Sequence, residues 1–200
     1  MTPDRAADLA AHAGLRLSER ELTEVAAIID QTGSLAPETE VVARYQAGAL
    51  TPGILTFFLP HMWRYREGDS PVPMEVWRAM FLSAEYTEDM VVQTRPTKTV
   101  RAYRGATEEN REGISWTLDV RQAKYFAAER QAPGVVSAQV WVTNIPPHCM
   151  LARYTDGWEQ EITADVRRLT IHPLEDEGLL PKPRWWWRWW PPRGQRSGGS

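Results

Sequence analysis

The chain has little that would support a disulfide framework, a membrane span or a secretion signal. It contains one cysteine among 200 residues, so no intrachain disulfide can form and a reducing compartment is the simpler expectation. Its longest apolar run, Ile54 to Leu59, is far shorter than the ~20 residues that a membrane-spanning helix needs. Residues 1–14 include two aspartates and no continuous apolar stretch, which does not fit a secretory signal. We therefore expect a soluble protein in the cytoplasm of the producing or the target cell.

The histidines and the charged residues exclude two further classes of function. His61, His148 and His172 lie without the spacing of metal ligands, so the sequence predicts no metal site. Residues 181–200 hold five basic residues and no acidic one, so that a whole-chain charge of −3 leaves −8 on residues 1–180. Because affinity for duplexes comes largely from Lys and Arg side chains that neutralise phosphates, an acidic body argues against a broad nucleic-acid-binding face.

Length and composition fit one folded domain. Two hundred residues with 42% hydrophobic content are enough for one real core. We expect a single domain over residues 1–178, with a helical half at 1–92 and a strand-rich half at 93–178, followed by a tail at 179–200. Helices first and strands later is the profile of an α+β domain.

The first half of the chain has helical periodicity. Ser18 and Glu21 have the spacing of a capping box, and Gly33 is placed to end the helix that begins there. Apolar residues at helical spacing predict further helices at 37–45 and 74–83.

One strongly apolar segment of this half lies between two prolines. Pro52 and Pro60 are predicted to bound it. The tryptophan, methionine and phenylalanine residues of this region, Trp77 among them, are interpreted as core rather than as a cofactor site, because large apolar side chains at helical spacing usually pack inside.

From about Thr97 the apolar residues recur at every second position, which is typical of strands. Strands are predicted at 100–104, 114–116, 135–142, 150–153 and 159–169, with a polar loop at 106–113. A helix is predicted after the second of these strands, because Asp119 and Gln122 have the capping-box spacing.

Three short stretches stand in order in this second half: Tyr103–Gly105, Ser115–Thr117 and Glu159–Glu161. Because successive side chains of a strand point to opposite faces, Ser115 and Thr117 share one face of their strand. Glu159 and Glu161 share a face for the same reason. Trp116 is then left for packing on the other face of its strand, and Gln160 and Ile162 face away from the two glutamates.

Together the three stretches supply what a site for cleaving NAD needs. Cleavage of the nicotinamide glycosidic bond leaves a ribosyl cation, which a fixed carboxylate such as Glu161 stabilises. The pyrophosphate needs a cation, and the planar guanidinium of Arg104 can bind phosphate through two parallel hydrogen bonds. Hydroxyl groups from Ser115 and Thr117 can shape the pocket for the nicotinamide ribose.

The same residues resemble a known family. Four stretches resemble the arginine, serine-x-serine/threonine and glutamate-x-glutamate elements of mono-ADP-ribosyltransferases, and the similarity is closest to small members from bacteria and phages: Tyr103–Gly105, Gly113–Thr117, Ala123–Ala127 and Glu159–Ile162. The resemblance covers residues ~98–170. It implies an ADP-ribosyltransferase-like split β-sandwich, in which NAD lies between two small sheets and the N-terminal helices pack beside the cleft.

The resemblance also implies a role for each residue of the NAD pocket. Arg104 would hold NAD phosphate or ribose, and the Gly105 backbone would bind the nicotinamide amide. Ser115 would brace the catalytic glutamate by a hydrogen bond, and Thr117 would shape the pocket. Phe126 is a further candidate for packing near the nicotinamide.

Two glutamates would carry catalysis and acceptor choice. Glu161 would be the transferase glutamate, and Glu159 would face the acceptor, a position where a glutamate accompanies arginine acceptors in the family. The loop at 153–158 would help to choose the target, with Tyr154 and Trp158 as exposed aromatic contacts.

The sequence thus predicts a mono-ADP-ribosyltransferase that uses NAD as substrate, releases nicotinamide and modifies a macromolecule, with arginine of a protein as the leading acceptor, as a toxin or effector does. The enzymatic alternatives are an NAD glycohydrolase and a relative of the same fold that modifies nucleic acid. The non-enzymatic alternative is a binding module that acts through its tail.

The tail is the second unusual feature of the sequence. Tryptophan, arginine and proline dominate residues 184–196, and Trp with Arg suits either a membrane surface or a single-stranded nucleic acid. Alternatively, the tail folds back on an apolar groove of the body, or its last residues are an expression remnant.

Overall fold

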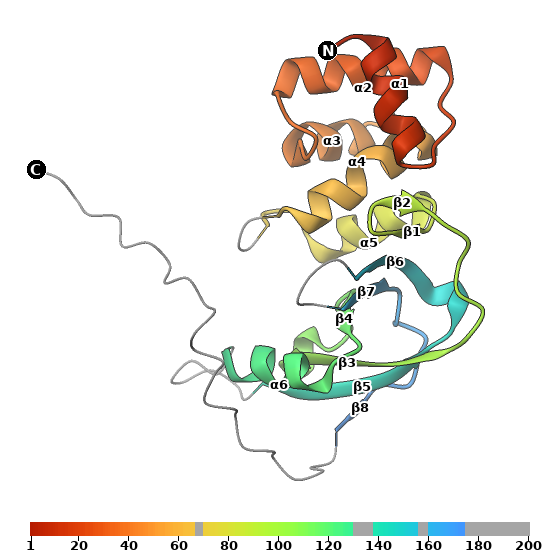
Figure 1. Cartoon of the computed structure of the whole chain (residues 1–200). Coiled ribbons are helices and arrows are strands. Elements are labelled where there is room, and N and C mark those ends of the chain that lie inside the picture. Colours follow the sequence, from red (N-terminus) through yellow and green to blue (C-terminus); the bar gives the residue numbers. More distant parts are fainter. Residues whose placement is uncertain (67–69, 130–137, 156–159, 175–200) are drawn as a thin grey trace, which may run out of the picture.

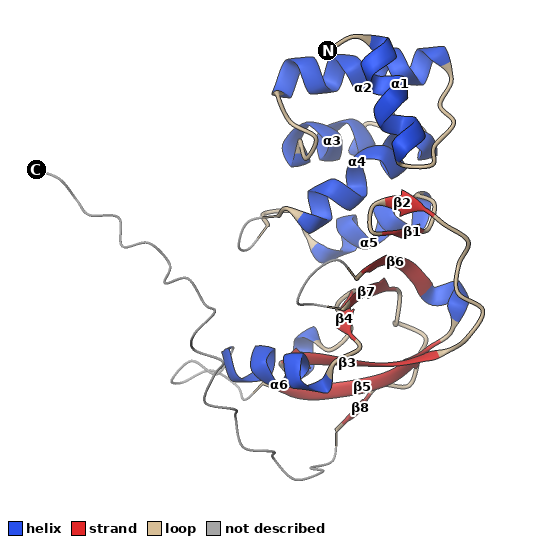
Figure 2. Cartoon of the chain, viewed as in Figure 1, coloured by secondary structure: helices blue, strands red, loops and turns tan. Residues whose placement is uncertain are grey.

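The computed structural model describes residues 1–66, 70–129, 138–155 and 160–174. Within these ranges, five helices stack at one end of the molecule and a mixed sheet fills the other end (Figures 1 and 2). The helices are α1 (Pro3–His12), α2 (Glu19–Thr32), α3 (Glu38–Gln46), α4 (Pro52–Arg64) and α5 (Met74–Ser83). The expected mixture of helices and strands is confirmed, and these five helices precede the first strand of the described residues.

Local signals in the sequence explain where several helices begin and end. Ser18 and Glu21 form both bonds of a capping box at the start of α2, and Gly33 ends this helix in the left-handed conformation at φ 66°. Thr51 caps α4 by accepting a hydrogen bond from the Ile54 N–H. Each cap satisfies backbone groups that a helix end otherwise leaves without partners.

The apolar segment between Pro52 and Pro60 is helical, and its helix does not end at the second proline, because α4 continues through Pro60 to Arg64. A proline inside a helix costs about 3 kcal/mol, but nearly every residue of α4 from Ile54 to Trp63 is buried. Burial of each large apolar side chain contributes about 1.5–3 kcal/mol, so packing offsets the cost of the proline.

Eight described strands form one mixed sheet in the order β2-β1-β6-β7-β4-β3-β5-β8. They are β1 (Thr87–Glu88), β2 (Val91–Val92), β3 (Val100–Ala106), β4 (Ser115–Thr117), β5 (Gln139–Ile145), β6 (Met150–Tyr154), β7 (Glu161–Ala164) and β8 (His172–Pro173). The β1–β6 pair is parallel and the other pairs are antiparallel. The sequence did not predict β1, β2 and β8, and the first two lie within the half that was expected to be helical.

The pairing between neighbouring strands of the sheet is shortest where β4 meets β3. These two strands share a single registered pair, Tyr103 with Thr117, whereas β3 and β5 share seven pairs. The sheet therefore consists of a β2-β1-β6-β7-β4 part and a β3-β5-β8 part joined by a narrow link. The resemblance implied a split pair of small sheets, and in the structure hydrogen bonds connect all eight described strands into one sheet.

Two clusters of buried side chains hold the molecule together. The first is built by α1 to α5, and Ile114, Leu151 and Tyr154 from the strand-rich half join it. In the second, Trp116 and Ile162 from one part of the sheet pack with residues of β3 and β5 from the other part. The helices thus share a core with the sheet, and the two parts of the sheet share another.

The sixth described helix, α6 (Val120–Glu129), packs on β3 and β5. Asp119 caps it by accepting a hydrogen bond from the Arg121 N–H. Gln122 does not complete the expected capping box: its side-chain carbonyl accepts a hydrogen bond from the Thr117 hydroxyl. The buried Thr117 hydroxyl is thus the donor to Gln122, and the Asp119 backbone N–H donates to Thr117 instead.

No helix in the described part of the chain is long and apolar enough to cross a membrane. The tail predicted at 179–200, including the Trp- and Arg-rich residues 184–196, lies outside the described residues. So does the first part of the strand predicted at 135–142.

Candidate active site

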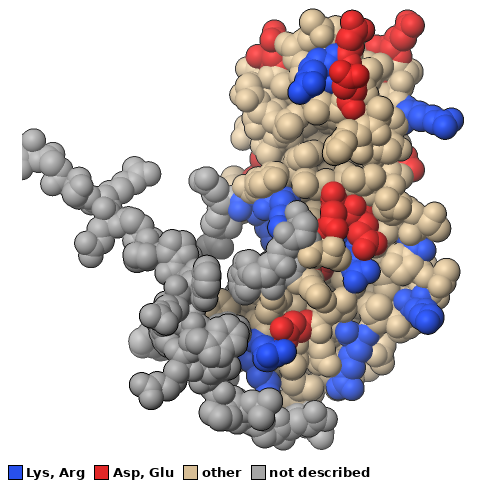
Figure 3. Space-filling model, in the orientation of Figure 1, with Lys and Arg blue, Asp and Glu red and all other residues tan. Residues whose placement is uncertain are grey.

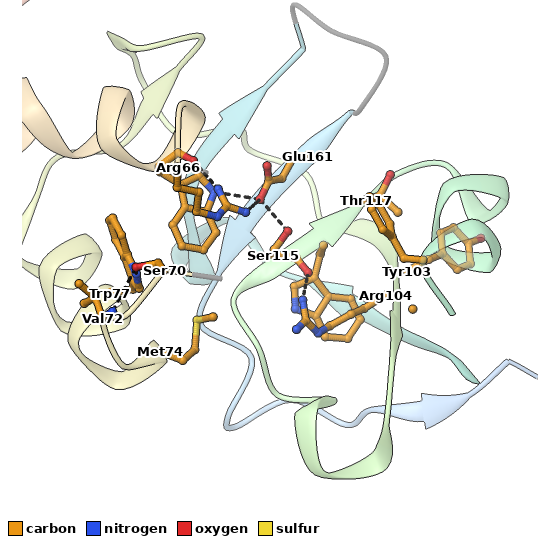
Figure 4. Close-up of a pocket in the computed structure, with 14 residues that line it drawn as sticks. Arg66, Ser70, Val72, Met74, Trp77, Tyr103, Arg104, Ser115, Thr117 and Glu161 are labelled. Atoms are coloured by element: carbon orange, nitrogen blue, oxygen red, sulfur yellow. Dashed lines mark hydrogen bonds and ion pairs between the residues drawn. The ribbon is translucent and has the colours of Figure 1, made fainter. Parts of the chain in front are cut away.

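A cavity of about 330 Å³ opens between the helical half and the sheet (Figure 4). The sheet and α6 supply one side of it through Tyr103, Arg104, Gly105, Ser115, Trp116, Thr117, Phe126 and Glu161. Its volume is at the lower end of the range of ~300–1,000 Å³ found for small-molecule sites. Segments that are far apart in the sequence therefore meet at one concave surface.

Strand register aligns three of these side chains in one row. Glu161 of β7 is paired with Thr117 of β4, and Thr117 is paired with Tyr103 of β3. Paired residues of neighbouring strands project to the same face of a sheet. The row crosses the narrow link between the two parts of the sheet, so the link itself forms the floor of the cavity.

The carboxylate of Glu161 is the buried charge at the centre of the cavity, with 6% of the residue exposed. Its Oε1 atom accepts hydrogen bonds from the Ser115 hydroxyl at 2.6 Å and from the Trp63 indole N–H at 2.9 Å. The guanidinium of Arg66 lies 3.9 Å from the same oxygen (Figure 4). No hydrogen bond from a described residue reaches Oε2, which leaves this oxygen for a ligand.

The guanidinium of Arg104 is bonded to the backbone at the start of β4. It donates to the Ser115 carbonyl at 2.6 Å and to the Asn110 carbonyl at 3.0 Å. It also lies flat against Gly113, where an added Cβ would be 2.2 Å from Nη2. Gly113 is therefore needed to make room for this guanidinium, and Arg104 fixes the β4 backbone that carries Ser115.

The wall formed by α6 approaches β3 closely at Gly105. A Cβ at this position would lie 2.2 Å from the Ala123 carbonyl and 2.4 Å from the Ala127 nitrogen, closer than real Cβ atoms come to backbone. Phe126 of the same helix faces the cavity. Only glycine allows α6 to bring this ring beside the β3 backbone.

Thr117 is tied to the start of α6. Its hydroxyl donates to the Gln122 side chain at 2.8 Å and accepts from the Asp119 N–H at 3.1 Å. Thr117 thus anchors the strand that bears Ser115 to the helix that bears Phe126, and it also lines the cavity.

The structure brings together all but one of the residues that the sequence proposed for an NAD site. The six that line the one cavity are Arg104, Gly105, Ser115, Thr117, Phe126 and Glu161. Glu159 lies outside the described residues, as does Trp158. The hydrogen bond between Ser115 and Glu161 is the contact expected for a residue that braces the carboxylate.

The prediction that Tyr154 is an exposed aromatic contact is wrong. Tyr154 is completely buried, and its hydroxyl donates to the Pro60 carbonyl of α4. Burial and the negative charge of Glu161 raise the pKa of the Tyr154 hydroxyl well above its ordinary value. Tyr154 is buried because its strand, β6, packs against the helices and does not lie at the surface.

The helical half supplies the other side of the cavity, which the sequence did not reveal. Its lining residues are Trp63, Arg66, Ser70, Val72, Met74 and Trp77. Trp77 was interpreted as core, and it is 1% exposed, but it also borders the cavity. No local pattern identifies these residues, because their role depends on how α4 and α5 dock on the sheet.

Charge is mixed on the face of the molecule seen in Figure 3. Acidic side chains gather mainly over the helical end and its junction with the sheet, and basic side chains are scattered over the sheet-bearing end. The described residues on this face do not form a continuous basic surface. Among the described residues, no three His, Cys, Asp or Glu side chains lie close enough to hold a metal ion.

No family model, curated protein or solved structure matches the chain. The residues that line the cavity are therefore the basis for assigning a function.

Proposed function

We propose that the protein is an ADP-ribosyltransferase, which transfers ADP-ribose from NAD to a macromolecule, with protein arginine as the acceptor, and releases nicotinamide. One observation carries this proposal. A buried carboxylate, Glu161, is braced by the Ser115 hydroxyl at 2.6 Å in a cavity that also holds two guanidinium groups.

The carboxylate suits the charge that develops during the reaction. When the bond between the ribose C1′ and the nicotinamide nitrogen breaks, its electron pair leaves with nicotinamide and positive charge spreads over C1′ and the ring oxygen. A fixed negative charge in a site with little water stabilises this cation strongly. Oε1 of Glu161 is engaged by protein donors, so Oε2 is the atom that meets the ribose.

The guanidinium groups suit the two phosphates of the dinucleotide. Arg66 and Arg104 both line the cavity, from the helical side and the sheet side respectively. Arginine forms paired hydrogen bonds with phosphate oxygens. Arg104 was the cation expected from the sequence, and Arg66 adds a second one on the opposite wall.

The arrangement of the sheet supports the finer description of the fold as an ADP-ribosyltransferase-like split β-sandwich. Its two parts meet through one residue pair, share one core and carry the candidate site where they join.

In the transfer step, a nitrogen of the acceptor guanidinium forms a bond to C1′ and gives up a proton to solvent. Gly105 and Phe126 form the wall for nicotinamide.

The proposal is tested with NAD labelled in its adenylate part and a bacterial protein extract. We expect the wild-type protein to label extract proteins and to release nicotinamide, and Glu161→Gln to do neither while it keeps the wild-type melting temperature. Glu109→Gln, which changes an exposed glutamate outside the cavity, serves as the control and should label like wild type. Equal labelling by wild type and Glu161→Gln would exclude the role of Glu161.

One observation favours NAD hydrolysis as a second candidate. Among the described residues that line the cavity, Glu161 is the only carboxylate. Both acceptors give up a proton in the reaction, but water is neutral and already a nucleophile, whereas an arginine side chain is a cation that must be held in place and deprotonated to attack C1′. Nicotinamide release without labelling of any protein would select this candidate over transfer.

A further inference from the structure

Trp63 joins the helical half to the candidate catalytic carboxylate. It lies near the end of α4, and its indole N–H donates to Oε1 of Glu161 at 2.9 Å, across 98 positions of sequence. Trp63 is 1% exposed. This direct hydrogen bond ties the wall of the cavity to its floor.

Surrounding aromatic rings hold the indole in one orientation. The Trp63 ring makes edge contacts with the rings of Trp77 and Phe81, whose centroids lie 5.2 and 5.4 Å away. The guanidinium of Arg66 covers the ring at 3.6 Å. These contacts restrict rotation of the indole, and in this orientation its N–H points to Glu161.

The two donors on Oε1 differ in what they can do. The Ser115 hydroxyl can rotate and can either donate or accept, whereas an indole N–H only donates and carries no charge that changes with pH. The indole bond is therefore the one that fixes which oxygen is engaged. With Oε1 held, Oε2 is directed to the cavity.

We propose that Trp63 is a positioning residue for the transfer reaction: its indole N–H fixes Glu161 so that one carboxylate oxygen faces the ribose. This inference rests on the proposed function. It makes the helical half a working part of the site, because the residue that orients the carboxylate comes from α4.

Kinetics of nicotinamide release test the positioning role. Trp63→Phe keeps a large ring for the contacts with Trp77 and Phe81 and removes the N–H. We expect kcat to fall about 10- to 100-fold, since one hydrogen bond to a charged group is lost, with KM for NAD changed by less than about twofold. Wild-type kcat, or a change confined to KM, would overturn the proposal.

Trp141→Phe is the matched control. Trp141 is also buried and also donates its N–H to a protein oxygen, the Ala106 carbonyl at 3.0 Å, but it lies outside the cavity lining. This variant carries the same loss of ring volume and of one hydrogen bond. Its kcat should stay within about twofold of wild type, and a fall equal to that of Trp63→Phe would mean that general destabilisation causes both effects.

An NMR measurement separates this inference from the proposed function. In the ¹⁵N-labelled protein, the indole N–H signal that disappears in Trp63→Phe should shift upfield in Glu161→Ala, because the carboxylate acceptor is lost. An unchanged signal would overturn the proposal without any assay of activity. If the wild-type protein releases no nicotinamide, the proposed function fails, whereas this signal still decides whether Trp63 holds Glu161.

Discussion

The two halves of the molecule contribute to the candidate site in different ways. The strand-rich half supplies Ser115, Thr117 and Glu161 through alternation along β4 and β7, a local rule that can be seen in the sequence. The helical half supplies Trp63 and Arg66 through the docking of α4 on the sheet, which no local rule predicts. Motifs therefore identify the chemical groups of such a site, whereas packing determines how they are held.

The halves also differ in how they are stabilised. The helices have local caps and ion pairs, such as Arg44 with Glu40 of the preceding turn. The junction depends on a buried cation, Arg78 of α5, which donates to the Glu112 carbonyl at 2.6 Å and lies 3.6 Å from Asp165. Disruption of the sheet or of the junction should therefore cost more than disruption of the helix surface.

The largest effect is expected in the sheet, at Gly105. Gly105→Ala would place a Cβ against the backbone of α6, which cannot move without separating from β3. We expect the free energy of unfolding to fall by more than about 3 kcal/mol, measured by urea denaturation. The control is Gly53→Ala in α4, where the added Cβ meets only side-chain atoms of Leu17 and Glu21 and should cost less than about 1 kcal/mol. Equal costs would contradict the close packing of α6 on β3.

The next effect is expected at the junction of the halves. Arg78→Met should lower the free energy of unfolding by about 2–3 kcal/mol, because it leaves the Glu112 carbonyl without its buried donor. Arg44→Met removes two ion pairs of a half-exposed arginine within the helical half and should cost less than about 1 kcal/mol. Denaturation curves of both variants check the difference, and a larger loss for Arg44→Met would reverse the comparison.

A smaller effect on stability, but a distinct effect on binding, is expected at Gly113. Gly113→Ala would displace the Arg104 guanidinium, which can move because it is the end of a flexible side chain. We expect a loss of about 1 kcal/mol in unfolding free energy and a rise of about tenfold in KM for NAD, as Arg104→Gln should also produce. Unchanged KM in both variants would remove Arg104 from the binding site.

The smallest effect concerns acid stability at the junction. The hydrogen bonds from Arg167 hold the pKa of the Asp165 carboxyl below its ordinary value of 3.8. A carboxyl with a depressed pKa stabilises the fold above its unfolded-state pKa, and this contribution disappears as pH falls through the folded-state pKa. Asp165→Asn should therefore flatten the loss of stability below about pH 4 in melting curves recorded across pH. Parallel curves for the two proteins would contradict this assignment.

Particular elements illustrate how much of the fold could be predicted. The ends of α2 follow from its caps at Ser18 and Gly33, which are local signals. The bounds of α5, which has no side-chain cap, follow from apolar periodicity, which is also local. Strand β1 has two residues and pairs both with β2, which follows it closely in the chain, and with Ala152 and Arg153 of β6. The pairing with β6 joins residues that are far apart in the sequence, so no short window of sequence contains it. Tertiary packing likewise carries α4 through Pro60 and buries Tyr154.

The candidate site also has one contact that the sequence predicted and one that it did not. The contact of Ser115 with Glu161 was predicted from the family resemblance, whereas alternation only placed Ser115 on one face with Thr117. The hydrogen bond from the Trp63 indole to Glu161 was not predicted, because a tryptophan at helical spacing is usually a core residue. Trp63 belongs to the core and also lines the cavity. A residue with both roles gives no separate signal in the sequence.

The central claim is that NAD lies in the cavity between the helical half and the sheet. The most direct measurement is a crystal structure of Glu161→Gln, which should bind NAD without cleaving it, after soaking with saturating NAD. We expect nicotinamide between Gly105 and residue 161, with the pyrophosphate beside Arg66 and Arg104. An empty cavity, or NAD bound at a different surface, would contradict it.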